Sequence, residues 1–182
     1  MVDIQLPIFL TITPQYNMDT IKDKINNFFK WVKGTKLVEL NSIDVKEDPV
    51  RPELDLEFRK SYGRKIYGLK FDNEIEGIIC VAYTNDIPKS VKELDIMSQN
   101  AYLKKDANTA VAYTVWSRKR GAGREIIHKA IEFIKTNKEI KKLVTLSPLT
   151  PMATHFHIRN KAKLISINPT TQNFEYSLYQ KM

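Results

Sequence analysis

The sequence predicts an α+β, or mixed α/β, fold with a mostly antiparallel central sheet flanked by helices. Three observations support this prediction. A strand, a glycine turn, an amphipathic helix and a second strand follow one another within residues 109–146, which is a βαβ unit. Residues 65–84 are typical of an antiparallel hairpin, and residues 163–179 of two closing strands. Since the chain has 182 residues and no visible repeat, we expect one domain, residues 1–182.

The first half of the chain alternates strand and helix patterns. Apolar residues of 18–32 recur at helical spacing and Gly34 follows them as a stop signal, so an amphipathic helix is expected there. Asp72 and Asn73 are the turn residues of the hairpin. The expected elements are a strand at 7–12, the helix, a strand at 36–40, a loop at 44–52, strands at 65–71 and 76–84, and a helix at 88–103 with Val91, Leu94 and Met97 inward.

The second half contains the strongest patterns. Residues 109–116 form a markedly apolar strand that runs directly into a basic, glycine-containing turn. The helix that follows, residues 123–135, has an apolar face of Ile126, Ile127, Ala130, Ile131, Phe133 and Ile134, opposite Glu125, His128, Lys129, Glu132 and Lys135. A strand at 142–146, a helix at 151–160 and strands at 163–167 and 174–179 complete the expected order.

Charge is unevenly placed along the chain. Residues 1–117 carry 16 basic and 17 acidic groups, whereas residues 118–182 carry 13 basic and 4 acidic groups, a net charge of +9 for the last third. This predicts an anionic partner, either a phosphate-rich small ligand or nucleic acid. The alternative is that the many lysines come from an AT-rich genome and have no binding role. The single cysteine, Cys80, allows no internal disulfide, which favours a reducing, cytoplasmic location. The start of the chain resembles neither a signal peptide nor a membrane span.

The turn at 118–124 is typical of an anion site. The first N–H groups of a helix have no partner within the helix and lie in a favourable field for an anion, and glycines let the backbone approach that anion closely. Arg118, Arg120 and Arg124 add positive charge. A Walker A loop would need Gly-Lys-Ser/Thr after four residues, and a dinucleotide fingerprint would need a third glycine, so both alternatives fail on spacing.

The spacing Arg118-x-x-Gly121-x-Gly123, after an apolar strand and before an amphipathic helix, resembles the pyrophosphate-binding motif of the GNAT superfamily, the Gcn5-related acyl-CoA N-acyltransferases. The resemblance extends over residues 109–179 and implies an acyl-CoA-binding domain with acetyl-CoA or another acyl-CoA as co-substrate. It implies that the cofactor lies against the strand end, the turn and the start of the helix: Val115, Trp116, Arg118, Lys119, Arg120, Gly121, Ala122, Gly123 and Arg124.

The next motif departs from that family. Where its members carry a tyrosine near the thioester sulfur, this sequence has His157, within Phe156-His157-Ile158-Arg159-Asn160-Lys161-Ala162. Together with Leu146-Ser147-Pro148, this stretch resembles the serine and histidine motifs of malonyl-CoA decarboxylase, whose catalytic part has a GNAT fold. That resemblance implies catalytic roles for Ser147 and His157. The C-terminal part is also similar to uncharacterised GNAT-like proteins of tailed bacteriophages.

Other candidates are weaker. His155 points away from His157 on a helix and His128 lies on the polar helix face, so both are expected at the surface. The three histidines match no usual metal-ligand spacing, and no metal is expected. Asp55 and Glu57 lie at alternate positions and are candidates for a pair that binds the acceptor substrate of a transferase. A solvent-exposed edge is the commoner reason for such a pattern.

Three functions follow from these patterns. The first is an acyltransferase that moves an acyl group from coenzyme A to an amine, with acetyl as the expected group and with His157 protonating the thiolate. The second is a decarboxylase of malonyl-CoA or a similar thioester that uses Ser147 and His157. The third is a non-catalytic binding protein for nucleic acid or a host protein. A monomer or homodimer without a membrane partner is expected in each case.

Overall fold

The computed structural model describes residues 18–179, so the strand expected at 7–12 lies outside the described residues. The described residues divide into two compact units between Lys33 and Gly34. The first contains nearly all of helix α1 (Met18–Gly34), which covers the predicted residues 18–32 and continues through Gly34. No described helix is long and apolar enough to cross a membrane.

The second unit is built on an eight-stranded sheet with the order β1-β2-β3-β4-β5-β8-β6, with β7 paired to β8. All its neighbouring strands run antiparallel except β4 and β5, which are parallel. This confirms the predicted fold class. The strands are β1 (Lys36–Glu39), β2 (Lys65–Phe71), β3 (Glu74–Thr84), β4 (Thr109–Ser117), β5 (Lys142–Thr145), β6 (Ser147–Pro148), β7 (Lys163–Ile167) and β8 (Thr171–Tyr176).

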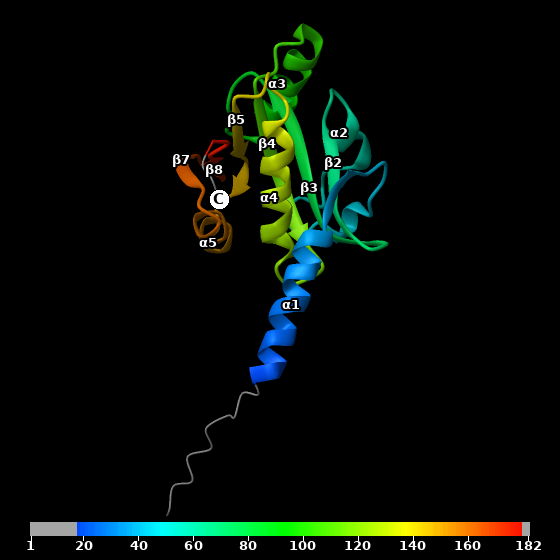
Figure 1. Ribbon diagram of the computed structural model, residues 1–182. Coiled ribbons are helices and arrows are strands. Elements are labelled where there is room, and N and C mark those ends of the chain that lie inside the picture. The colour runs from blue at the N-terminus through cyan, green and yellow to red at the C-terminus, as the bar shows by residue number, and fades with distance from the viewer. Residues whose placement is uncertain (1–17, 180–182) are drawn as a thin grey trace, which may run out of the picture. The chain divides into compact units, whose positions relative to one another are not determined.

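Helices cover both faces of this sheet (Figure 1). Helix α4 (Ala122–Lys135) lies over β3 and β4. On the other face the hydrophobic core joins Leu94 of α3 (Val91–Lys104) to Ile78, Cys80 and Val111. The remaining helices of this unit are η1 (Val45–Glu47), α2 (Leu56–Lys60) and α5 (Pro151–Arg159). Within the described residues the element order thus matches the predicted one, with η1, α2 and the short strand β6 added.

Two details of helix packing differ from the prediction. Phe133, expected on the buried face of α4, is 45% exposed and packs its ring against Tyr67 at 5.2 Å. Glu125, expected at the surface, is buried and accepts a hydrogen bond from Thr35 at 3.2 Å. Both residues lie near the edges of the apolar stripe, where the neighbouring strands and not the helical period decide which side chain is covered.

Candidate functional site

The site begins at an irregularity in β4. The pairing of β3 with β4 shifts register between Cys80 and Val81, so that Tyr113 is an extra residue on β4. A β-bulge of this kind bends the strand and ends regular pairing. The parallel pairing of β4 with β5 accordingly stops at Ala112 and Thr145. Beyond that point β4 continues to Ser117, whereas β5 ends at Thr145 and the chain passes into β6, so the two segments separate.

The separation leaves backbone groups of β4 without a neighbouring strand. Arg118 donates its N–H to the carbonyl of Glu76 on β3, at 2.8 Å. The direction of backbone hydrogen bonding alternates along an antiparallel strand. The backbone N–H and C=O of Trp116 therefore also point to β3, whereas those of Val115 and Ser117 point to the opposite side, where pairing with β5 has stopped. Val115 and Trp116 are the two strand residues predicted to hold a cofactor. The peptide group of Val115 points to the side without a neighbouring strand, whereas the indole of Trp116 is buried in the core.

The turn after β4 presents further unpaired donors. Gly121 is the N-cap of α4 and has φ +91°, a left-handed conformation that favours glycine. The N–H groups of Arg120, Gly121 and Gly123 donate to no backbone acceptor within residues 18–179. Two of the predicted cationic side chains point elsewhere, since Arg118 pairs with Glu47 and Lys119 pairs with Glu76. Backbone donors, more than side-chain charge, make this turn suitable for an anion.

A cavity of about 450 Å³ lies between the separated strands and α5. Ser117 and Gly123 line the end nearest the turn, and Ser147 and His157 line it as well. The other described lining residues are mostly apolar: Pro49, Val50, Ala112, Tyr113, Thr114, Val115, Pro148, Thr150, Met152, Ala153 and Phe156. His157 is the one histidine among the described lining residues, and none of the others is Asp, Glu, Lys, Arg or Cys.

Tertiary structure brings Ser147 and His157 together. Ser147 lies in β6, and His157 lies in α5, which begins at the N-cap Thr150 and Pro151. The Ser147 hydroxyl and Nε2 of His157 are 2.7 Å apart, and both residues are 5% exposed. On the other side of the ring, Nδ1 of His157 is 2.8 Å from the hydroxyl of Tyr176. Phe174 stacks on the imidazole at 4.8 Å and fixes its plane.

Comparison with solved structures gives the fold a name. Malonyl-CoA decarboxylase from Agrobacterium vitis superposes with a TM-score of 0.56 and 19% identity over 81% of this chain and 42% of that chain. A proposed GNAT-family acetyltransferase from Desulfovibrio desulfuricans gives 0.54 and 10% identity over 79% of this chain and 99% of that one. The chain has the GNAT fold. A Bacillus subtilis acetyltransferase in complex with CoA gives 0.51 and 9% identity over 78% and 95% of the two chains.

The chain therefore spans less than half of the decarboxylase and nearly the full length of these two acetyltransferases. It matches no protein-family model and no curated protein sequence. At these identities the likeness concerns the GNAT fold alone.

Burial sets the protonation of the central side chains. It lowers the pKa of His157 from 6.5 to about 4, and it raises the pKa of Tyr176 well above its usual value. At pH 7 the imidazole and the phenol are thus both neutral. This differs from the expectation of an imidazole that ionises near pH 6.5, because the sequence does not show how deeply α5 and β8 enclose the ring.

Sequence reasoning missed two polar residues of this site. Tyr176 was expected only as part of a closing strand, and its contact with His157 joins residues 19 positions apart. Arg51 was assigned to a loop. Its Nε donates to the carbonyl of Tyr113 at 2.9 Å and its Nη2 to the carbonyl of Leu146 at 2.8 Å. The guanidinium thus bridges β4 and the segment after β5 where their own pairing stops, and no local signal marks this role.

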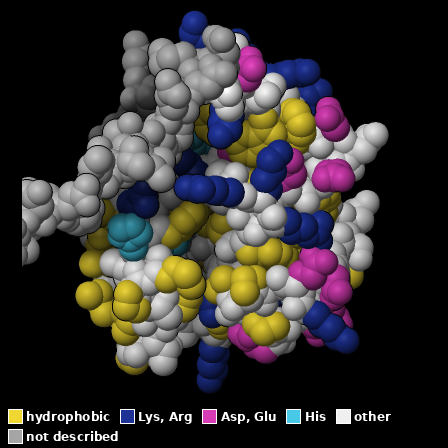
Figure 2. All heavy atoms as spheres, turned by 90° about the horizontal axis from the view of Figure 1, so that it is seen from below, with side chains coloured by type: hydrophobic (Ala, Val, Ile, Leu, Met, Phe, Trp, Pro, Cys, Tyr) yellow, Lys and Arg dark blue, Asp and Glu magenta, His cyan; other side chains and the backbone are white. Residues whose placement is uncertain are grey.

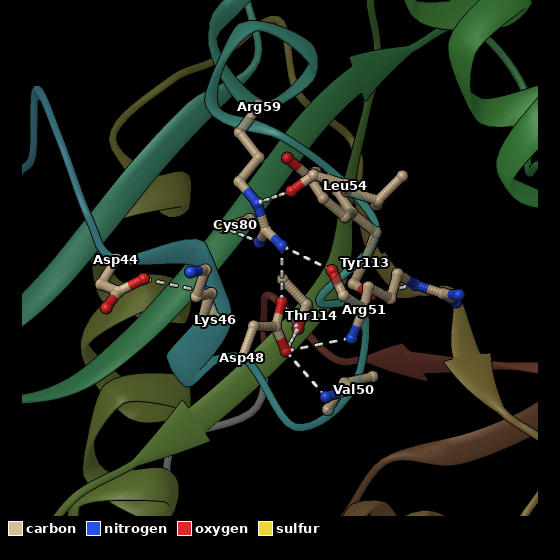
Figure 3. Close-up of polar contacts among 10 residues, drawn as sticks. All are labelled: Asp44, Lys46, Asp48, Val50, Arg51, Leu54, Arg59, Cys80, Tyr113 and Thr114. Atoms are coloured by element: carbon tan, nitrogen blue, oxygen red, sulfur yellow. Dashed lines mark hydrogen bonds and ion pairs between the residues drawn. The ribbon is translucent and has the colours of Figure 1, made fainter.

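A buried ion pair supports the Arg51 segment (Figure 3). The Asp48 carboxylate accepts from Arg59 at 2.8 Å, from the Thr114 hydroxyl at 2.9 Å and from the N–H groups of Val50 and Arg51. Asp48 and Arg59 side chains are fully buried. This network holds the loop after η1 against the bulged part of β4 and so fixes one wall of the cavity.

The remaining candidates lie apart from the cavity chemistry. Asp55 caps α2, because its carboxylate accepts a hydrogen bond from the N–H of Phe58 at 2.7 Å. This capping role explains an acidic residue at position 55 without a role in substrate binding. His155 is exposed as expected. His128 instead lines a second cavity with Arg124, and its pKa is lowered, first by burial and then by that arginine. Within residues 18–179 no group of three His, Cys, Asp or Glu side chains is placed to hold a metal ion.

Proposed function

We propose that this GNAT-fold chain is an enzyme that uses acyl-CoA as a substrate. The observation that carries this proposal is the cavity between β4 and β5, which begins beside unpaired amides and ends at the buried pair Ser147 and His157. The amides of Arg120, Gly121 and Gly123 would receive the diphosphate, and the open peptide groups of Val115 and Ser117 would bond the amide groups of the pantetheine arm. The thioester of the substrate would then lie near His157.

The geometry of the pair favours decarboxylation of a malonyl-type thioester. Loss of carbon dioxide breaks the bond between the carboxylate carbon and the α carbon and leaves the electron pair on the thioester as an enolate. That anion needs a proton donor and no base. A neutral imidazole with a hydroxyl at 2.7 Å would supply such a donor, and both residues are only 5% exposed.

Acyl transfer to an amine, the first expectation from the sequence, is the second candidate. It is favoured by the nearly full-length fold similarity to two acetyltransferases. It also needs a base that deprotonates the acceptor ammonium, and no carboxylate is among the described residues that line the cavity. For this reason we place it after decarboxylation.

One set of measurements separates these reactions. Purified protein is titrated with CoA by calorimetry, then incubated with malonyl-CoA while carbon dioxide is measured, and with acetyl-CoA plus a panel of amines while free thiol is measured. We expect binding and carbon dioxide release, both retained in H155Q. H157Q should bind CoA within about threefold of wild type and lose about 100-fold or more in turnover, the usual contribution of a proton donor. Amine-dependent thiol release without carbon dioxide would establish the transferase instead.

Binding to nucleic acid remains the third possibility. Figure 2 shows Lys and Arg side chains of the described residues scattered among acidic and hydrophobic ones on the face seen from below, without one continuous basic tract there. If CoA failed to bind and the protein bound DNA or RNA with strong salt dependence, this function would replace the enzymatic one.

A further inference from the structure

We propose that a cationic cavity between α4 and the end of α5 binds a phosphate monoester. One source of that group is the 3′-phosphate that CoA carries on its ribose, and the other is a separate phosphorylated small molecule. The part that concerns CoA rests on the proposed function. The site itself can be tested with inorganic phosphate, without any acyl-CoA.

Side chains from three elements form the walls of the cationic cavity. Arg124 and His128 come from α4, Arg159 and Lys161 from the end of α5, and Tyr176 from β8. No Asp or Glu is among the described lining residues. The cavity has a volume of about 240 Å³. Because one water molecule needs only about 10–15 Å³ of cavity, a phosphate group fits there with water around it.

The three cations of this cavity differ from those of the turn before α4. Arg118 and Lys119 pair with carboxylates. In contrast, Arg124, Arg159 and Lys161 form no ion pair with any residue of 18–179. Like charges that face one cavity repel one another. A phosphate monoester, with a charge of about −1.5 to −2 at pH 7, removes that repulsion and accepts charge-assisted hydrogen bonds.

His128 lies in the field of two of these cations. Its pKa is lowered, first by burial and then by Arg124, and Lys161 acts in the same direction. Glu125 and Glu132 act in the opposite direction, but neither lines the cavity. The lowered pKa keeps the imidazole neutral at pH 7, and a neutral imidazole has one N–H that can donate to an anion.

Lys161 occupies a backbone position at which glycine is favoured. Its φ is +66°, one residue after the C-cap of α5. The N–H of Lys161 donates to the carbonyl of Ile158 at 2.9 Å, and the N–H of Ala162 donates to the carbonyl of His157 at 3.0 Å. These two bonds are the Schellman arrangement of a helix end, in which a lysine strains the backbone. Binding of an anion by its ammonium gives Lys161 a role that glycine could not fill.

The cationic cavity adjoins the substrate cavity at the first turn of α4. Gly123 lines the substrate cavity, and the next residue, Arg124, lines the cationic cavity. A diphosphate on the N–H groups of Gly121 and Gly123 would therefore place its attached ribose beside Arg124. Since the same ribose carries the 3′-phosphate of CoA, the proposed substrate brings a phosphate monoester to this place.

The first test compares CoA with 3′-dephospho-CoA by calorimetry on the whole protein. We expect wild type to bind CoA about tenfold more tightly, and R159Q and K161G each to weaken CoA binding about threefold, as exposed charge pairs do. Both variants should bind 3′-dephospho-CoA like wild type. The matched control K163Q removes an exposed lysine that does not line the cavity and should leave both affinities unchanged.

Thermal unfolding without ligand separates binding from folding at Lys161. Since glycine adopts φ +66° without strain, K161G should unfold at or above the wild-type temperature while it binds CoA more weakly. A lower thermal midpoint for K161G would contradict the argument that the charge of Lys161, and not the fold, explains a lysine at this position.

The second test uses inorganic phosphate as the probe and follows its ³¹P NMR line width. Phosphate should bind wild type and K163Q and bind the double variant R159Q/K161G more weakly. If wild type binds CoA and 3′-dephospho-CoA equally while the double variant loses phosphate, the site stands and its ligand is a separate phosphorylated molecule. The proposal is overturned if the variants change neither the preference for CoA nor the binding of phosphate. Absence of CoA binding would refute the proposed function, and the phosphate measurement would still decide the site.

Discussion

Acid should destabilise the folded chain through His157. Its pKa is lowered by burial from 6.5 to about 4, so the unfolded state takes up a proton near pH 6.5 and the folded state only near pH 4. The unfolded state therefore binds more protons between these values, and the free energy of unfolding falls as pH falls. The contribution of His157 to the free energy of unfolding is fully present above pH 6.5. The loss should reach about 2 kcal/mol at pH 5 and about 3 kcal/mol near pH 4.

Urea denaturation at pH 7 and pH 5 measures this effect. At an m-value of roughly 2 kcal/mol per molar urea, the His157 contribution is about 1 M in the midpoint. The change between the two pH values should be smaller by that amount in H157Q than in wild type. The matched control H155Q alters an exposed histidine of the same helix and should retain the wild-type change. The reasoning is refuted if H157Q and H155Q lose the same stability between pH 7 and pH 5.

Three further predictions concern the turn, the ion pair and the thiol. Gly121→Ala forces a side chain into φ +91° and should cost about 1–2 kcal/mol. Gly123→Ala, whose new methyl would meet its nearest atoms at 3.4 and 3.5 Å, should cost nothing, and equal thermal midpoints of the two variants would contradict this. Asp48→Asn removes the charged partner of the buried Arg59 guanidinium and should cost about 3–5 kcal/mol in urea denaturation. Asp55→Asn keeps an N-cap and should be neutral, and a loss below about 1 kcal/mol for Asp48→Asn would contradict the reasoning. Burial raises the pKa of Cys80 to about 11, so an aromatic disulfide reagent at pH 8 should label it only at the rate of unfolding, and immediate labelling of the folded protein would contradict the burial.

Local patterns were sufficient for most elements of the fold. Helical spacing predicted α1, although the helix includes the expected stop residue Gly34, and the basic glycine turn after an apolar strand predicted the βαβ unit and the N-terminus of α4. The last strand was less well placed: it was expected at 174–179 and lies at Thr171–Tyr176, because polar residues Gln172 and Asn173 are buried by pairing with β6 and β7. Such pairing is not visible in a strand's own alternation.

The candidate site divides in the same way. Ser147 and His157 could be named from motifs because each motif is short and continuous. Their 2.7 Å contact, the low pKa of the imidazole and the phenol on its far side arise from the packing of α5 against β8. The opening between β4 and β5 depends on a bulge at Tyr113 that is held by Arg51, more than 60 residues earlier in the chain.

The sequence by itself therefore determined the order of most elements, the glycine turn before α4 and the two motif residues, since periodicity, turn chemistry and helix ends act over a few neighbouring residues. Only the tertiary structure decided which side chains are enclosed, which carbonyls Arg51 bridges and where His157 finds its partners. Those outcomes depend on desolvation and on hydrogen bonds between distant segments, and both are set when the sheet and its helices pack together.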